Sequence, residues 1–92
     1  MISLEDCIAL CGLTRAEVDA IAEHEHIPEI AAATLARYMT CRPGGLEDVR
    51  RMIAEDIRAA LDEGRSAHAA ELVSALRHLL SQHPELASHP GA

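Results

Sequence analysis

The sequence has no phenylalanine, no tryptophan and no lysine, and Tyr38 is its single tyrosine. Without these aromatic rings, the chain offers no platform for stacking nucleic-acid bases and no cage for a quaternary ammonium group. Its apolar residues are aliphatic instead, with 17 Ala, 11 Leu, 7 Ile and 3 Val among 92 residues. Alanine is the strongest helix former and adds little bulk where helices touch, so this composition favours closely packed helices.

Positive charge is also scarce. Fifteen acidic residues against eight arginines give a formal net charge of −7, and Arg50-Arg51 is the only adjacent basic pair. A chain of this charge repels phosphate backbones and anionic lipid. We therefore expect neither nucleic-acid binding nor attachment to a membrane surface.

Long apolar runs are absent from the sequence. None approaches the roughly 18 residues that a membrane-spanning helix needs, and the first residues lack the basic start and apolar centre of a signal peptide. These absences predict a cytoplasmic protein, and the arginine-only, alanine-rich composition favours a bacterial one. Three cysteines are then expected to be reduced thiols rather than disulfides.

Helix signals divide the chain into five segments. No stretch alternates apolar and polar residues, so we predict no strands. The expected N-caps are Ser3, Thr14 and Ser66, and Thr14 forms a capping box with Glu17. Pro28 fits the first position of a helix and Pro43 marks the strongest break. The predicted helices cover approximately residues 4–11, 15–26, 28–41, 46–63 and 67–83.

The last two segments have the clearest helical period. The apolar side of the fourth is expected to comprise Leu46, Val49, Ile53, Ile57, Ala60 and Leu61, and that of the fifth Ala69, Leu72, Val73, Leu76, Leu79 and Leu80. Short connections favour antiparallel neighbours. We therefore predict an all-α, compact bundle of about five helices, the last two forming an antiparallel hairpin. Residues 1–83 would form a single helical domain and residues 84–92 a short C-terminal tail.

Histidines and acids gather at the end of the second segment. Imidazoles and carboxylates are ligands of Fe, Zn and Mn. Glu23 and His26 stand three residues apart, which is the Glu-x-x-His spacing found in di-iron helical bundles. The candidate metal ligands are Glu23, His24, His26 and Glu29.

This chain has only one such motif, whereas di-iron bundles need two and further inward-facing carboxylates. A homodimer would double the motif, with Glu55 or Glu71 as additional ligands. The alternative is that the segment forms the solvated end of a helix, where a protonated histidine favours the negative end of the helix dipole. We favour this alternative, because charged helix ends are common.

Two further groups of residues have metal-binding chemistry. The fifth segment carries a polar stripe, and the first segment carries two cysteines four residues apart that should face the core. The stripe could serve as a metal site, as a pH-sensitive contact surface or as the solvent-exposed side of the helix. We favour the solvent-exposed side. The cysteines lack the C-x-x-C spacing of a zinc site, so we expect them to serve in packing. The residues concerned are His68, Glu71, Ala75, His78 and Gln82 in the stripe, and Cys7, Cys11 and Cys41 among the cysteines.

Residues 4–21 have the pattern of a helix-turn-helix motif, with Gly12 at the turn between the two predicted helices. The exposed side of the second helix would carry one arginine against three acids, so it would repel phosphates. We therefore do not expect DNA binding. The residues expected on that side are Thr14, Arg15, Ala16, Asp19, Ala20 and Glu23, with Glu17 close by.

The sequence has no phosphate-binding glycine loop, no nucleophile elbow and no metalloprotease helix. We therefore favour a small non-enzymatic helical interaction module that self-associates as a homodimer or docks on a protein partner. The alternative is a helical protein that binds Fe, Zn or Mn through a Glu/His site, which a dimer would share.

Overall fold

In the computed structural model, which describes residues 3, 6 and 12–87, every regular element is a helix. The predicted all-α class is thereby confirmed for this part of the chain. The helices that the structure describes are α2 (Arg15–Glu25), α3 (Glu29–Thr40), α4 (Gly45–Asp62), α5 (Ser66–Gln82) and α6 (Pro84–Ala87).

Two expectations concern the first residues of the chain. The predicted helix over residues 4–11, with Cys7 and Cys11, lies outside the described residues. Ser3, the expected cap of that helix, accepts a hydrogen bond through its hydroxyl from the Asp6 N–H at 3.1 Å. At the other end of the chain, α6 is a helical turn within the range that we predicted as a tail.

The corner between α2 and α3 follows from local chemistry. The predicted capping box is present, with Thr14 Oγ1 accepting from the Glu17 N–H and Glu17 Oε1 accepting from the Thr14 N–H. Helix α2 ends at His26, whose backbone is left-handed (φ 57°). Pro28 then lies at the N-cap of α3, one position before the place that we predicted for it. Its extended backbone (ψ 156°) turns the chain before α3 begins.

The corner between α3 and α4 requires a glycine. A Cβ atom on Gly45 would lie 1.7 Å from the backbone oxygen of Met39. Helix α4 therefore starts in direct contact with the end of α3, which no larger residue would allow. The predicted break around Pro43 is confirmed as this connection.

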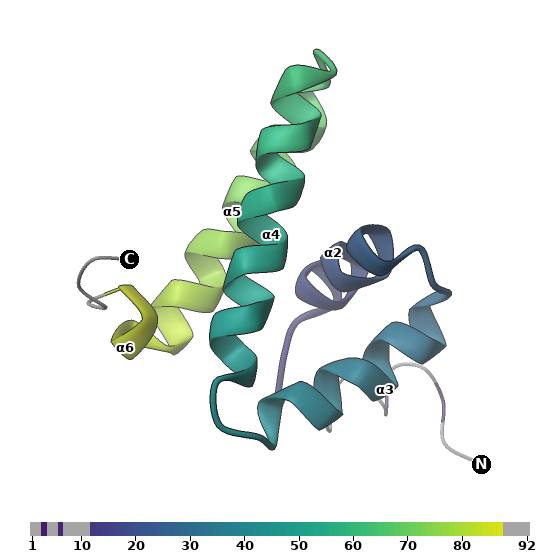
Figure 1. Cartoon of the computed structure of the whole chain (residues 1–92), viewed down its shortest axis with the longest axis vertical. Helices are drawn as coiled ribbons and strands as arrows, with labels where there is room; N and C mark the ends of the chain where they lie inside the picture. Colours follow the sequence, from purple (N-terminus) through teal and green to yellow (C-terminus); the bar gives the residue numbers. More distant parts are fainter. Residues whose placement is uncertain (1–2, 4–5, 7–11, 88–92) are drawn as a thin grey trace.

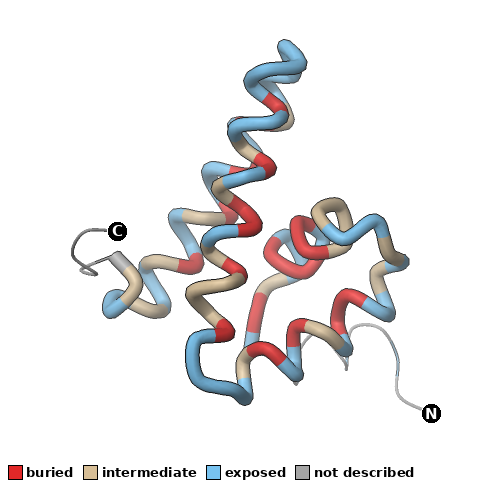
Figure 2. Tube along the Cα trace, viewed as in Figure 1, coloured by how far each residue is buried: buried red, intermediate tan, exposed pale blue. Residues whose placement is uncertain are grey.

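Helix α4 lies at the centre, with α2 and α3 to one side and α5 alongside it (Figure 1). The buried residues lie on the sides of the helices that face one another (Figure 2). Helix α3 contributes small residues to this core, so it approaches its neighbours closely. The largest fully buried apolar side chains are Val18, Ile21, Val49, Ile53 and Leu79.

The predicted apolar faces need two corrections. Leu61 and Val73 are exposed, whereas Met52 and Asp56 are buried on α4. Ala60 and Leu61 are adjacent, so they project about 100° apart and only Ala60 faces the core. No helix in the described part of the chain has the length and apolar character needed to cross a membrane.

Candidate functional site

The four residues predicted as metal ligands lie near the corner between α2 and α3, but each has a different environment. His26 is exposed at the left-handed end of α2. Glu29 pairs with the start of α2, where its Oε2 accepts a hydrogen bond from Arg15 Nε at 3.0 Å. Burial and a hydrogen bond with Glu29 raise the pKa of Asp19 to about 6. Glu29 is therefore part of a link between α2 and α3.

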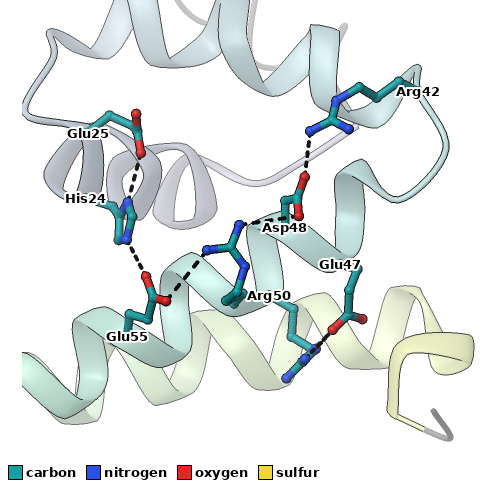
Figure 3. Close-up of polar contacts among 8 residues, drawn as sticks. His24, Glu25, Arg42, Glu47, Asp48, Arg50 and Glu55 are labelled. Carbon is teal, nitrogen blue, oxygen red and sulfur yellow. Dashed lines mark hydrogen bonds and ion pairs between the residues drawn. The ribbon is translucent and has the colours of Figure 1, made fainter. Parts of the chain in front are cut away.

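His24 joins α2 to α4. Its Nδ1 lies 2.9 Å from Glu25 Oε2, and its Nε2 lies 2.8 Å from Glu55 Oε1 (Figure 3). Burial of the ring lowers the pKa of His24, but the hydrogen bonds with Glu55 and Glu25 outweigh it, and the net pKa is raised. A protonated ring donates to both carboxylates at once.

The contact of His24 with Glu55 is one end of a chain of ion pairs. Glu55 contacts Arg51 at 3.6 Å, and Arg51 contacts Asp48 at 3.3 Å. Asp48 in turn contacts Arg42 at 2.5 Å (Figure 3). The chain connects the end of α2 with α4 and with the connection after α3. Its members are partly exposed, so solvent screens each pair and each contributes little to stability.

His68 joins α5 to α2 in a similar way. Its Nε2 lies 2.6 Å from Glu23 Oε1, and its Nδ1 lies 3.2 Å from Glu71 Oε1. The hydrogen bonds with Glu71 and Glu23 raise the pKa of His68. The structure therefore places the Glu23 carboxylate against His68 of α5.

Glu17 is a buried carboxylate, with only 1% of its surface exposed. Its Oε1 completes the capping box, and its Oε2 lies 2.9 Å from Nδ1 of His78 on α5. We had placed Glu17 beside the exposed side of α2 and Ala20 on that side, and both placements are wrong. Packing of α5 on α2 covers them, and Ala75 of the predicted polar stripe is buried as well.

Asp56 is the second buried acid, with 8% of its surface exposed. Its Oδ2 is enclosed and has no hydrogen-bond partner among the residues that the structure describes. Burial is the main reason that the pKa of Asp56 rises to about 6. The charges of Glu23 and Glu55 raise this pKa further, while His24 and His68 lower it. Asp56 is thus surrounded by acids and imidazoles from α2, α4 and α5.

A pocket of about 260 Å³ opens beside Asp56. The residues that give it polar character are Glu23, His24, His26, Asp56, Glu63 and Arg65. Arg65 Nη1 lies 3.5 Å from Glu63 Oε1 at the rim. Carboxylates therefore outnumber arginines in the pocket, and its interior is acidic.

The arrangement does not present a ready metal centre. Among the described residues, no three histidine, cysteine, aspartate or glutamate side chains are arranged to hold a metal ion. Both ring nitrogens of His24 and of His68 already face carboxylates. Binding of Fe, Zn or Mn through Glu23, His24, His26 and Glu29 therefore stays a prediction.

Sequence reasoning overlooked Asp56, although the period of α4 contains a signal. Asp56 stands seven residues after Val49, three after Ile53 and four before Ala60, which are all buried. These spacings place it in the middle of the apolar stripe. An acid at such a position is unusual and points to a specific role.

Apolar side chains are also exposed on the outer face of α3. Ile30 is 49% exposed and Tyr38 is 65% exposed, two helical turns apart. The guanidinium of Arg42 lies 5.8 Å from the centre of the Tyr38 ring, which is a cation–π geometry. The opposite face of α3 is the buried alanine-rich one.

Comparisons of the chain with protein-family models, with curated proteins and with solved structures find no match. A function for the protein must therefore be argued from the geometry described above.

Proposed function

We propose that the protein is a small, non-enzymatic interaction module that binds a protein surface through the outer face of α3. The observation that carries the proposal is the exposure of Ile30 and Tyr38 on a helix whose other face is already packed in the core. Tyrosine is enriched at protein interfaces, because its ring buries a large area and its hydroxyl keeps a polar partner.

The partner that we favour is a second copy of the chain. Small domains often cover a remaining apolar face by forming symmetric dimers. We keep an antiparallel hairpin of α4 and α5 and a cytoplasmic location as parts of this proposal.

Size-exclusion chromatography with light scattering tests the self-association. We expect a dimer at tens of micromolar and a monomer for the double variant Ile30→Ser, Tyr38→Ser. Leu61→Ser is the matched control, because Leu61 is an exposed apolar residue on α4. A monomeric wild-type protein would remove self-association and leave a different protein as the partner.

The second candidate function is binding of Fe, Zn or Mn. It is favoured by the gathering of Glu23, Glu55, Asp56, His24 and His68 from three helices. Elemental analysis of protein purified without chelator or affinity tag is the test. Substoichiometric amounts of all three metals would end this candidate.

A further inference from the structure

Asp56 has a hydrogen-bonding requirement that the described part of the chain does not meet. The residue is buried in α4, and none of residues 3, 6 and 12–87 gives its enclosed Oδ2 a hydrogen-bond partner. A buried carboxylate is normally hydrogen-bonded or paired, because removing its charge from water is costly. The raised pKa of Asp56, about 6, is the expected consequence of this cost.

The neighbouring imidazoles do not supply the missing donor. Nδ1 and Nε2 of His24 face Glu25 and Glu55. Nδ1 and Nε2 of His68 face Glu71 and Glu23. Each ring carries at most two N–H donors, so both rings are fully engaged by other carboxylates.

The pocket beside Asp56 has room for a donor from outside. Its volume is about 260 Å³, whereas one water molecule takes about 30 Å³ in the liquid. Ala59 and Ala60 form an apolar part of the wall, next to the acids Glu23 and Glu63. Arg65, the arginine in this wall, is paired with Glu63.

We propose that this pocket receives the ammonium or guanidinium group of a lysine or arginine side chain from a partner protein, with Asp56 accepting its hydrogen bonds. Such a group brings several N–H donors and a positive charge to an acidic site. Its aliphatic stem packs on Ala59 and Ala60. The proposal rests on the proposed function as an interaction module, and it adds a basic partner protein that is distinct from the second copy of the chain at α3. The chain has no lysine of its own, and its net charge of −7 favours a basic partner.

The test uses two small probes that imitate the ends of these side chains, n-butylammonium chloride and n-butylguanidinium chloride. The ¹³C resonance of the Asp56 carboxyl group is followed against pH in the wild-type protein. We expect saturating probe to lower the pKa of Asp56 by about one pH unit, since a neighbouring cation favours the charged carboxylate. Tetramethylammonium chloride at the same ionic strength is the control, because it has no N–H donor and should leave the pKa unchanged.

A matched pair of variants places the effect in the pocket. Asp62 is exposed on α4 and lies outside the pocket lining, so Asp62→Asn removes the same charge as Asp56→Asn. Saturable changes in the amide resonances of Ala59 and Ala60 should persist in Asp62→Asn and disappear in Asp56→Asn. The carboxyl titration needs no variant, so the test stands even if Asp56→Asn fails to fold.

Three results would overturn the proposal. These are an Asp56 titration that the donor probes leave unchanged, an equal effect of tetramethylammonium, and a stoichiometric metal ion bound by Asp56 in the purified protein. None of them bears on the outer face of α3. If the pocket test fails but the double variant Ile30→Ser, Tyr38→Ser breaks the dimer, the proposed function stands and the proposal for the pocket is wrong. Conversely, if the protein is monomeric but the probes bind in the pocket, the interaction site is the pocket at Asp56 and the outer face of α3 is not.

Discussion

Replacing Glu17 by alanine tests how the buried acid of α2 stabilises the fold. The substitution removes the acceptor of the Thr14 N–H at 2.9 Å and the contact with His78 at 2.9 Å. It also removes one buried methylene group, Cγ, from a side chain that is almost fully enclosed.

The expected loss of stability is the sum of three contributions. A capping interaction is worth about 1 kcal/mol, and the one buried methylene about 0.8 kcal/mol. The side chain of His78 is 47% exposed, so its pairing with Glu17 is screened by solvent and is worth only about 0.5 kcal/mol. Glu17→Ala should therefore lower the free energy of unfolding by about 2 kcal/mol. Glu17→Gln keeps the methylene and an oxygen that accepts from the Thr14 N–H, so this variant should lower the free energy of unfolding by less than about 1 kcal/mol.

Urea denaturation followed by far-UV circular dichroism at neutral pH gives both values. Asp62→Ala is the control, because an exposed residue should change the free energy of unfolding by no more than about 0.5 kcal/mol. The reasoning would be refuted if Glu17→Gln were as destabilising as Glu17→Ala. The charge of Glu17, rather than the cap and the packing, would then be the main contribution.

Two further predictions concern the corner glycine and the dependence of stability on pH. Gly45→Ala should be more destabilising than Gly64→Ala, because the new Cβ at position 45 meets the backbone of α3. At Gly64 only the left-handed backbone conformation costs free energy, about 1–2 kcal/mol. Equal decreases in the free energy of unfolding, measured by urea denaturation, would contradict this. The pKa values of His24, His68 and Asp56 are raised, so each group holds more protons in the folded than in the unfolded chain over the pH range in which it titrates. Their contribution to stability should be fully present near pH 4 for Asp56 and near pH 6 for the histidines. This contribution should be lost as the pH rises, so the free energy of unfolding should decrease from pH 5 to pH 8. An increase over that range would contradict the prediction.

The helices could be predicted because their ends are set by local chemistry. The pairing of Thr14 with Glu17 starts α2 within four residues, and Pro43 separates α3 from α4. Such signals depend on neighbours along the chain, which a sequence displays directly. The position of Pro28 was wrong by one residue, because a proline fits either at the N-cap or at the first helical position.

The candidate site could not be predicted in the same way, because its contacts join distant parts of the chain. His68 is 45 residues from Glu23, and His78 is 61 residues from Glu17. Hydrophobic periodicity assigns acids and histidines to the wet side of a helix and cannot indicate which of them meet. It therefore failed at Glu17, which is buried.

The segment that resembled a metal motif serves largely to form a corner. His26 ends α2, and Glu29 pairs with Arg15 where α3 begins. His24 and Glu23 reach across to α4 and α5 instead. Their polar groups are thus engaged in holding helices together, so the spacing of these residues on one helix is explained without a bound ion.

Asp56 is different, because its burial lowers the stability of the fold while its neighbours leave its Oδ2 unpaired. Asp56→Asn keeps the shape of the side chain and removes the buried charge, so it should raise the free energy of unfolding at neutral pH by about 1–3 kcal/mol. Near pH 4 the aspartic acid of the wild-type protein is itself neutral, and the difference between the two proteins should vanish. Urea denaturation of both proteins at the two pH values measures this change. If Asp56→Asn were instead destabilised at neutral pH, Asp56 would have a donor within the folded chain, and the reason for seeking one on a partner would disappear.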